Sequence, residues 1–186
     1  MSAEMLKKLL VSEITPHIDD TNTKHAAVLV VIYGPELKTI MIKKPMTMQL
    51  HAGEISFPGG KLAENDSDLL DTAIRETREE ISLEVLRDQV IGQLKPVTTR
   101  NSGFTIIPFL AVIDGISELR PNYDEVDEIL HIPLVPLLRG LRLDDDPNHR
   151  ALFEAYTTTF ENQIVWGASA RILKQLHDIF KQNNLL

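Results

Sequence analysis

The sequence contains no cysteine. Disulfide bonds, a thiolate nucleophile and thiolate zinc sites are therefore excluded, and the composition suits a reducing cytoplasm. No apolar run approaches the roughly 20 residues that a membrane span needs, and the segment MSAEMLKKLL lacks the apolar core of a secretory signal. We therefore expect a soluble cytoplasmic protein that has no membrane partner.

Basic residues are also in short supply. The chain has 19 lysines and arginines against 27 aspartates and glutamates, a net charge of -8, and no basic cluster. A protein that follows nucleic-acid phosphates needs a basic surface, so we expect no nucleic-acid partner. An acidic protein can still act on a small phosphorylated molecule when metal ions mediate the contact.

The length of 186 residues is that of one domain. Apolar residues at helical spacing predict a helix over residues 2–14, and a polar linker follows it. We therefore divide the chain into an N-terminal helix and linker, residues 1–24, and a domain over residues 25–186. We expect the helix to pack either on its own domain or on a second subunit. A homodimer is therefore one of the two alternatives.

Strands stand before, between and after helices in the rest of the chain. β-branched runs on either side of Gly34 predict a hairpin, and Asp68 is the predicted N-cap of a helix. The predicted strands cover residues 25–33, 38–42, 90–94, 104–114, 126–131, 152–160 and 163–166. The predicted helices cover residues 68–81, 133–138 and 168–182. This order is typical of a layered, mixed α/β domain.

The segment FPGGKLAENDSDLLDTAIRETREEISL, residues 57–83, concentrates acidic residues and glycines. On a helix, Glu76 lies beside both Glu79 and Glu80, because it precedes them by three and four positions. At about 4 Å and an effective dielectric near 20, two like charges repel by roughly 4 kcal/mol. A hard divalent cation that prefers oxygen ligands, such as Mg²⁺, would relieve this repulsion.

Two neighbouring features complete a candidate site. Arg75 stands four positions before Glu79, which lets it brace that carboxylate. A turn at Gly59 and Gly60 would bring backbone close to the helix, so that the Gly60 carbonyl becomes a further metal ligand. The alternative is an ordinary turn and a solvated acidic helix. The glutamates alone favour that alternative, whereas the ordered combination favours one site.

The ordered combination resembles the Nudix box, in which a glycine is followed by five residues, a loop glutamate, seven residues and the pattern Arg-Glu-aliphatic-x-Glu-Glu-x-Gly-aliphatic. Gly60 opens it here, and residues 75–83, RETREEISL, close it. The interval before Arg75 is one residue longer than usual. Asp66 stands where the loop glutamate is expected, and Ser82 replaces the second glycine.

The resemblance implies an α/β/α sandwich with a mixed sheet. It also implies a hydrolase that depends on Mg²⁺ or Mn²⁺ and cleaves a nucleoside diphosphate linked to another group. The catalytic residues that it implies are Glu79 and Arg75. The metal ligands that it implies are Gly60, Glu76, Glu79 and Glu80.

The flanking sequence narrows the resemblance. The blocks LHAGEISFPGGK, GQLKPVTTRNSGFTIIPFLAVI, PNYDEVDEILHIPLVPLL and IVWGASARIL are similar to blocks of the coenzyme A pyrophosphatase-like branch, which implies coenzyme A or an acyl-CoA-like compound as the substrate. Lys44 and Gln49 stand where that branch carries arginines, and glutamine offers no fork for phosphate. An ADP-ribose or dinucleotide pyrophosphatase is therefore one alternative, and a non-catalytic Nudix ligand-binding module is another.

Further residues outside the box also have predicted roles, and for most of them a purely structural interpretation stays open. Glu125 matches a downstream acidic position and either binds a second metal, acts as the base, or belongs to a solvated loop. Phe57 is expected to pack beneath the helix of the box. Contacts with substrate phosphates are predicted, against ordinary surface charge or loop ordering, for Lys44, His51, Lys61 and Arg100.

Overall fold

Residues 24–33 are rich in β-branched side chains and form β1 (Lys24–Tyr33), the central strand of the sheet. β1 runs parallel to β7 (Phe104–Ile113) along its whole length. Its other edge is shared by two antiparallel partners, β2 (Lys38–Lys43) and β4 (Gly59–Lys61). This computed structural model describes residues 3–17, 23–99, 103–144 and 155–186.

Four further strands complete this mixed sheet in the described ranges, and all of them pair antiparallel to β2 or β7. They are β3 (Ile55–Ser56), β5 (Val90–Gln93), β6 (Val97–Thr98) and β8 (Glu128–Pro133). A smaller sheet contains β9 (Arg142–Leu143), β10 (Tyr156–Phe160) and β11 (Gln163–Val165). A single 3-10 turn, Arg87–Gln89, leads into β5.

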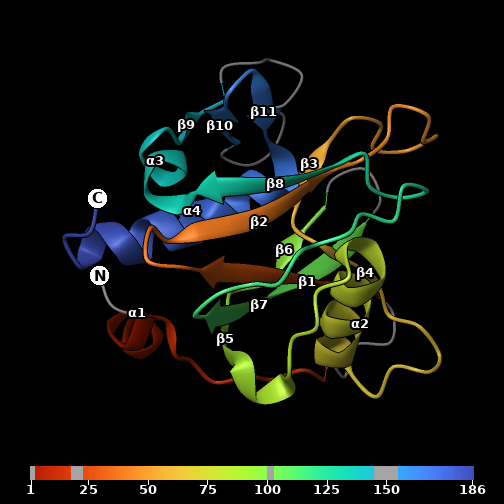
Figure 1. Ribbon diagram of the computed structural model, residues 1–186, viewed down its shortest axis with the longest axis horizontal. Coiled ribbons are helices and arrows are strands. Elements are labelled where there is room, and N and C mark those ends of the chain that lie inside the picture. Colours follow the sequence, from red (N-terminus) through yellow and green to blue (C-terminus); the bar gives the residue numbers. More distant parts are fainter. Residues whose placement is uncertain (1–2, 18–22, 100–102, 145–154) are drawn as a thin grey trace.

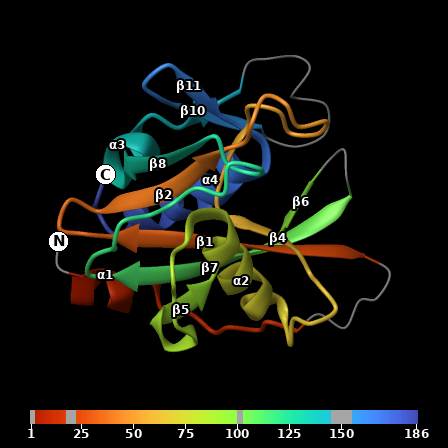
Figure 2. The same cartoon turned by 45° about the vertical axis from the view of Figure 1, so that its right-hand side comes forward.

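Alternation along β1 separates two apolar cores, because successive side chains of a strand point to opposite faces. The odd-numbered side chains of residues 27–31 pack in the core that contains the buried face of α2 (Leu69–Ile81). The even-numbered side chains of residues 28–32 pack in the core that contains α1 (Ala3–Leu10), α3 (Leu134–Arg139) and α4 (Gly167–Gln182). Figures 1 and 2 show α2 and α4 on opposite sides of the sheet. The predicted α/β/α sandwich with a mixed sheet is confirmed.

The N-terminal helix packs on its own chain. The side chains of Leu6 and Leu10 are 0% and 3% exposed and lie in the core on the α4 side. The segment after the helix is tied to β5, because the Ser12 amide donates to the Ile91 carbonyl at 3.2 Å. α1 therefore contributes to the same core as the rest of the domain.

Most predicted elements are present with small shifts at their ends. The helix predicted over residues 68–81 is α2, and Asp68 caps it by accepting a hydrogen bond from the Asp71 amide at 2.8 Å. β8 begins at Glu128, two residues later than predicted. The predicted strand 152–160 starts outside the described residues, and β10 covers its second half.

Two predictions around the glycine pair were wrong. Gly59 and Gly60 do not form a turn but belong to β4, paired with β1. A Cβ at Gly59 would lie 2.2 Å from the Ala27 carbonyl oxygen, so only glycine allows this close pairing. Phe57 does not lie beneath α2: it is 2% exposed in the core on the α4 side, two positions after Ile55 on the same face.

In the ranges that the structure describes, every helix is too short or too polar to cross a membrane.

Candidate functional site

The helix α2 carries the acidic residues of the box and is held at both ends. At its N-terminus, Arg87 donates to both oxygens of the capping Asp68, at 3.2 and 2.7 Å. At its C-terminus, Ser82 takes the left-handed conformation with φ 57°, and its amide donates to the Arg78 carbonyl. This conformation favours glycine, which explains the glycine of the usual box at this position.

Arg75 binds the carboxylate of the preceding loop through a fork of two hydrogen bonds. Its Nε donates to Asp66 Oδ1 at 2.7 Å and its Nη2 donates to Asp66 Oδ2 at 2.9 Å. Asp66 also accepts from the Ala63 amide and the Thr72 hydroxyl, and the Arg75 hydrogen bonds hold the pKa of Asp66 well below its ordinary value. Asp66, which stands at the position of the loop glutamate in the sequence, thus binds the arginine of the box.

The same guanidinium braces two glutamates of the box. Arg75 Nη1 donates to Glu76 Oε1 at 2.9 Å and to Glu79 Oε2 at 3.0 Å, and Nη2 donates to the Lys61 carbonyl at 3.3 Å. The brace on Glu79 is the contact that the spacing predicted. The backbone at Gly60 also restrains Glu76, because a Cβ at Gly60 would lie 2.4 Å from the carboxyl carbon of Glu76.

Glu80 is the most buried acid of the helix, with a side chain 1% exposed. Its Oε1 accepts from the Lys44 ammonium at 2.5 Å and its Oε2 accepts from the Gly59 amide at 2.9 Å. Burial raises the pKa of Glu80, and Lys44 and the Gly59 amide partly offset this effect.

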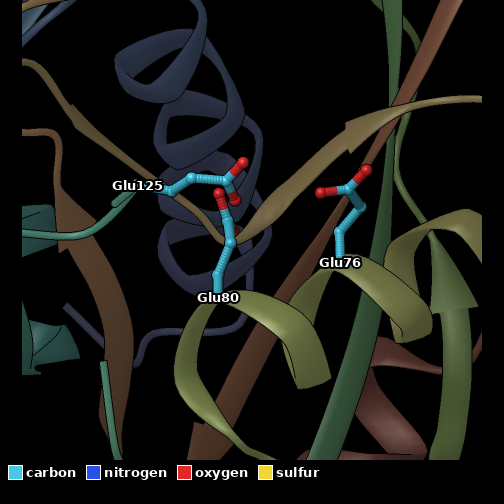
Figure 3. Close-up of side chains that lie close together, drawn as sticks. All are labelled: Glu76, Glu80 and Glu125. Atoms are coloured by element: carbon cyan, nitrogen blue, oxygen red, sulfur yellow. The ribbon is translucent and has the colours of Figure 1, made fainter. Parts of the chain in front are cut away.

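A third acidic residue, Glu125, comes to Glu76 and Glu80 from a loop that is distant in the sequence. The Asn122 amide donates to the Glu80 carbonyl at 2.9 Å and the Arg120 amide donates to the Ile81 carbonyl at 3.1 Å, so the loop before β8 is fastened to the end of α2. Asn122 in turn accepts from the Glu125 amide at 2.9 Å. This brings Glu125 beside the helix (Figure 3).

Glu76, Glu80 and Glu125 each present a carboxylate oxygen within 4.8 Å of the other two. Figure 3 shows the three carboxylates directed into one space from α2 and from the loop. Three carboxylates, one of them almost wholly buried, are hard oxygen donors of the kind that Mg²⁺ and Mn²⁺ prefer. The donor set therefore fits a hard divalent cation.

Glu79 lies apart from this group of three. Its side chain is 48% exposed, and its carboxylate contacts Arg75. Because it follows Glu76 by three positions, it shares the helix face but points to a more open part of it.

The remaining predicted site residues make contacts of different kinds. His51 Nδ1 lies 2.8 Å from Glu54 Oε2 in its own loop, with φ 63°, which agrees with loop ordering. The Lys61 ammonium lies 5.3 Å from the centre of the Phe104 ring. Lys44 contacts Glu80, and Arg100 lies outside the described residues.

Sequence reasoning missed two parts of the site. It did not find that Lys44 pairs with a carboxylate of the box, or that residues 120–122 fasten the loop of Glu125 to α2. Both contacts join segments far apart in the chain, and no local pattern encodes them.

A hollow of about 800 Å³ beside the loop of Glu125 is lined by Tyr33, Lys38, Tyr123 and His131 among others, but by none of the three clustered glutamates. The cluster is therefore separate from this hollow.

Comparisons with known proteins identify the family of the chain. The NUDIX domain family model matches residues 23–156. The chain is 32% identical over 181 residues to a protein of Yersinia enterocolitica named as an uncharacterized Nudix hydrolase, NudL, covering 94% of this chain and 90% of that one. A NudL of Pectobacterium atrosepticum is 33% identical over 157 residues, covering 82% and 81%.

Solved structures share the fold at lower identity. A MutT/nudix family protein of Enterococcus faecalis superposes with a TM-score of 0.59 at 16% identity, covering 91% of this chain and 64% of that one. The NUDIX domain of Shewanella oneidensis NrtR, complexed with ADP ribose, superposes with a TM-score of 0.53 at 18% identity, covering 64% and 79%. With the family match and the NudL relatives, the chain belongs to the Nudix family and is a Nudix hydrolase.

Proposed function

We propose that this Nudix hydrolase cleaves the diphosphate bond of a nucleoside diphosphate derivative with Mg²⁺ or Mn²⁺, and that coenzyme A or an acyl-CoA-like compound is its substrate. The observation that carries the proposal is the cluster of Glu76, Glu80 and Glu125 on the box helix and the adjoining loop. The flanking sequence blocks that resemble the coenzyme A pyrophosphatase-like branch support the choice of substrate.

In this proposal, Glu76, Glu80 and Glu125 hold the metal, together with the Gly60 carbonyl. A bound divalent ion supplies charge neutralisation at the phosphoryl oxygens and a lowered pKa for the attacking water. The contribution of the chain is to position these ligands: Arg75 fixes Glu76, and the Gly59 amide fixes Glu80.

Proton transfer is a separate task, and we assign it to Glu79. Its carboxylate is oriented by Arg75 yet remains 48% exposed, so it is open to water and substrate. Glu125, in contrast, lies within the group of three carboxylates, which supports a role as ligand.

One observation favours a second substrate class. Lys44 and Gln49 replace the arginines of the coenzyme A branch, and Lys44 is already paired with Glu80. A site with fewer forked phosphate contacts suits ADP-ribose or a dinucleotide, and the Shewanella oneidensis domain was solved with ADP ribose. Intact acidic residues argue against a third candidate, a ligand-binding module without turnover.

The deciding experiment is a screen of coenzyme A, acetyl-CoA, ADP-ribose and a dinucleotide with Mg²⁺ and with Mn²⁺, with the products identified by mass. We expect phosphopantetheine and adenosine 3′,5′-bisphosphate, which is 3′-phosphorylated AMP, from coenzyme A. AMP and ribose phosphate from ADP-ribose, without coenzyme A cleavage, would favour the second class. Tight binding of a nucleotide with no product under any metal would contradict catalysis.

A further inference from the structure

Lys44 contacts Glu80, the buried carboxylate of the metal cluster, whereas Arg75 contacts Glu76. Its side chain is 17% exposed and its ammonium lies 2.5 Å from Glu80 Oε1, while Glu80 Oε2 already accepts from the Gly59 amide. Both oxygens of Glu80 therefore have a partner. A divalent cation that binds Glu80 through Oε1 must share that oxygen with the ammonium or replace it.

Electrostatic interactions decide whether the divalent cation and the Lys44 ammonium share Glu80 Oε1 or whether the cation replaces the ammonium. At equal distance and dielectric, the repulsion between a single and a double positive charge is about twice the attraction between the ammonium and one carboxylate. Burial of Glu80 strengthens both interactions because water screens them little. Replacement of the ammonium by the divalent cation is therefore favoured over sharing.

The backbone of Lys44 is held while its side chain can move. Its amide donates to the Glu54 carbonyl at 2.9 Å and its carbonyl accepts from the Gly53 amide at 3.1 Å, directly after β2. Lysine carries a compact charge on a flexible four-carbon stem, unlike the planar fork of arginine. The displaced ammonium thus stays at the site and remains available to an anion there.

We propose that Lys44 is an exchangeable counter-ion of the metal centre. It neutralises Glu80, is displaced when a divalent cation binds the glutamates, and then contacts the diphosphate of the substrate. The exchange orders the two binding events, with the metal before the nucleotide. The contact with diphosphate rests on the proposed function, whereas the displacement by metal does not.

The first test measures Mn²⁺ binding without substrate by electron paramagnetic resonance. Lys44→Met removes the competing charge at similar length, and we expect Mn²⁺ to bind about tenfold tighter than in the wild type, a typical coupling between two sites. The matched control is Lys174→Met, because Lys174 pairs with Asp178 at 2.6 Å on α4, away from the cluster. We expect no change in the control. Unchanged or weaker Mn²⁺ binding by Lys44→Met would overturn the displacement.

A second measurement uses the unaltered chain, in case Lys44→Met does not fold. Lysines are acetylated briefly and the modified sites are quantified by mass spectrometry. We expect acetylation of Lys44 to rise when Mn²⁺ is added and to fall again when α,β-methylene-ADP, a diphosphate that resists hydrolysis, is added with it. Lys174 should not respond. If Mn²⁺ leaves Lys44 acetylation unchanged, the displacement is wrong.

Steady-state kinetics test the contact with diphosphate, using the substrate that the screen identifies. We expect Lys44→Met to raise KM about tenfold or more with a smaller change in kcat, since the lysine binds the diphosphate and is not the base. An unchanged KM would overturn this contact. If the wild type hydrolyses no nucleotide, the proposed function fails, while the Mn²⁺ measurements still decide the displacement.

Discussion

Arg75 donates two parallel hydrogen bonds to Asp66, at 2.7 and 2.9 Å, and this pair joins the loop of the box to its helix. The Asp66 side chain is 3% exposed and that of Arg75 is 23% exposed, so the pair is shielded from solvent. Because Arg75 also holds Glu76 and Glu79, the loop carboxylate orients the acidic residues indirectly.

Loss of the Asp66 carboxylate is expected to destabilise the fold. Asp66→Ala leaves the guanidinium of Arg75 without its main partner, so the free energy of unfolding should fall by about 3 kcal/mol. Urea unfolding monitored by circular dichroism measures this change. Asp88→Ala, at an exposed position, is the control and should change stability by less than about 0.5 kcal/mol. Equal effects of the two substitutions would show that the pair adds no stability.

The same pair predicts a pH dependence with a defined sign. The pKa of Asp66 is lowered in the folded protein, so its contribution is fully present above the unfolded value near 3.8 and is lost as the pH falls toward the folded value. The stability difference between the wild type and Asp66→Ala should therefore shrink when unfolding is measured from about pH 6 down to about pH 3. A difference that stays constant over this range would contradict the lowered pKa.

Ser82 is expected to cost stability because it holds a left-handed conformation, with φ 57°. This conformation costs about 1 kcal/mol or more for a residue with a Cβ, whereas glycine adopts it freely. Ser82→Gly should raise the free energy of unfolding by about 1 kcal/mol in urea titrations. Ser82→Ala keeps the Cβ and serves as control. A loss of stability in Ser82→Gly would show that the hydrogen bond from Ser82 to the Arg120 carbonyl matters more.

Gly60 is expected to be required by the metal site more than by the fold. Gly60→Ala would place a Cβ 2.4 Å from the Glu76 carboxyl carbon, which displaces a flexible side chain. We expect Mn²⁺ affinity to fall about tenfold or more, with the free energy of unfolding changed by less than about 1 kcal/mol. Gly115→Ala, where a Cβ meets nothing within 4 Å, is the control for both measurements. Normal Mn²⁺ affinity in Gly60→Ala would exclude Glu76 as a ligand held in its observed position.

Substitutions of Glu79 and of Glu125 are expected to have different effects on kcat and on Mn²⁺ binding. Glu79→Gln should lower kcat by a factor of about 100 or more while Mn²⁺ affinity changes little, because its carboxylate lies apart from the cluster. Glu125→Gln should weaken Mn²⁺ binding, since it removes one of three clustered carboxylates. Glu84→Gln, at an exposed position after the box, is the control. If Glu79→Gln loses Mn²⁺ and Glu125→Gln does not, the two roles are exchanged.

The sequence by itself determined what depends on local geometry. The residue type of Asp68 correctly predicted the cap of α2. Helical spacing correctly predicted that Arg75 reaches Glu79, because residues four positions apart are neighbours on any helix. The β-branched runs on either side of Gly34 likewise predicted the hairpin of β1 and β2, and the order of strands and helices predicted a layered, mixed α/β domain. The box motif was sufficient to indicate the family, which the comparisons confirm.

Only the tertiary structure decided which distant groups join the box. Glu125 reaches Glu80 because backbone hydrogen bonds fasten the loop of Asn122 to the end of α2, and Lys44 reaches Glu80 because β2 ends beside that helix. The strand at Gly59 has the same origin, since it depends on how closely β1 approaches. The physical reason is that such contacts follow from the packing of whole elements against one sheet. Helical spacing reports neighbours within one element and carries no information on the next.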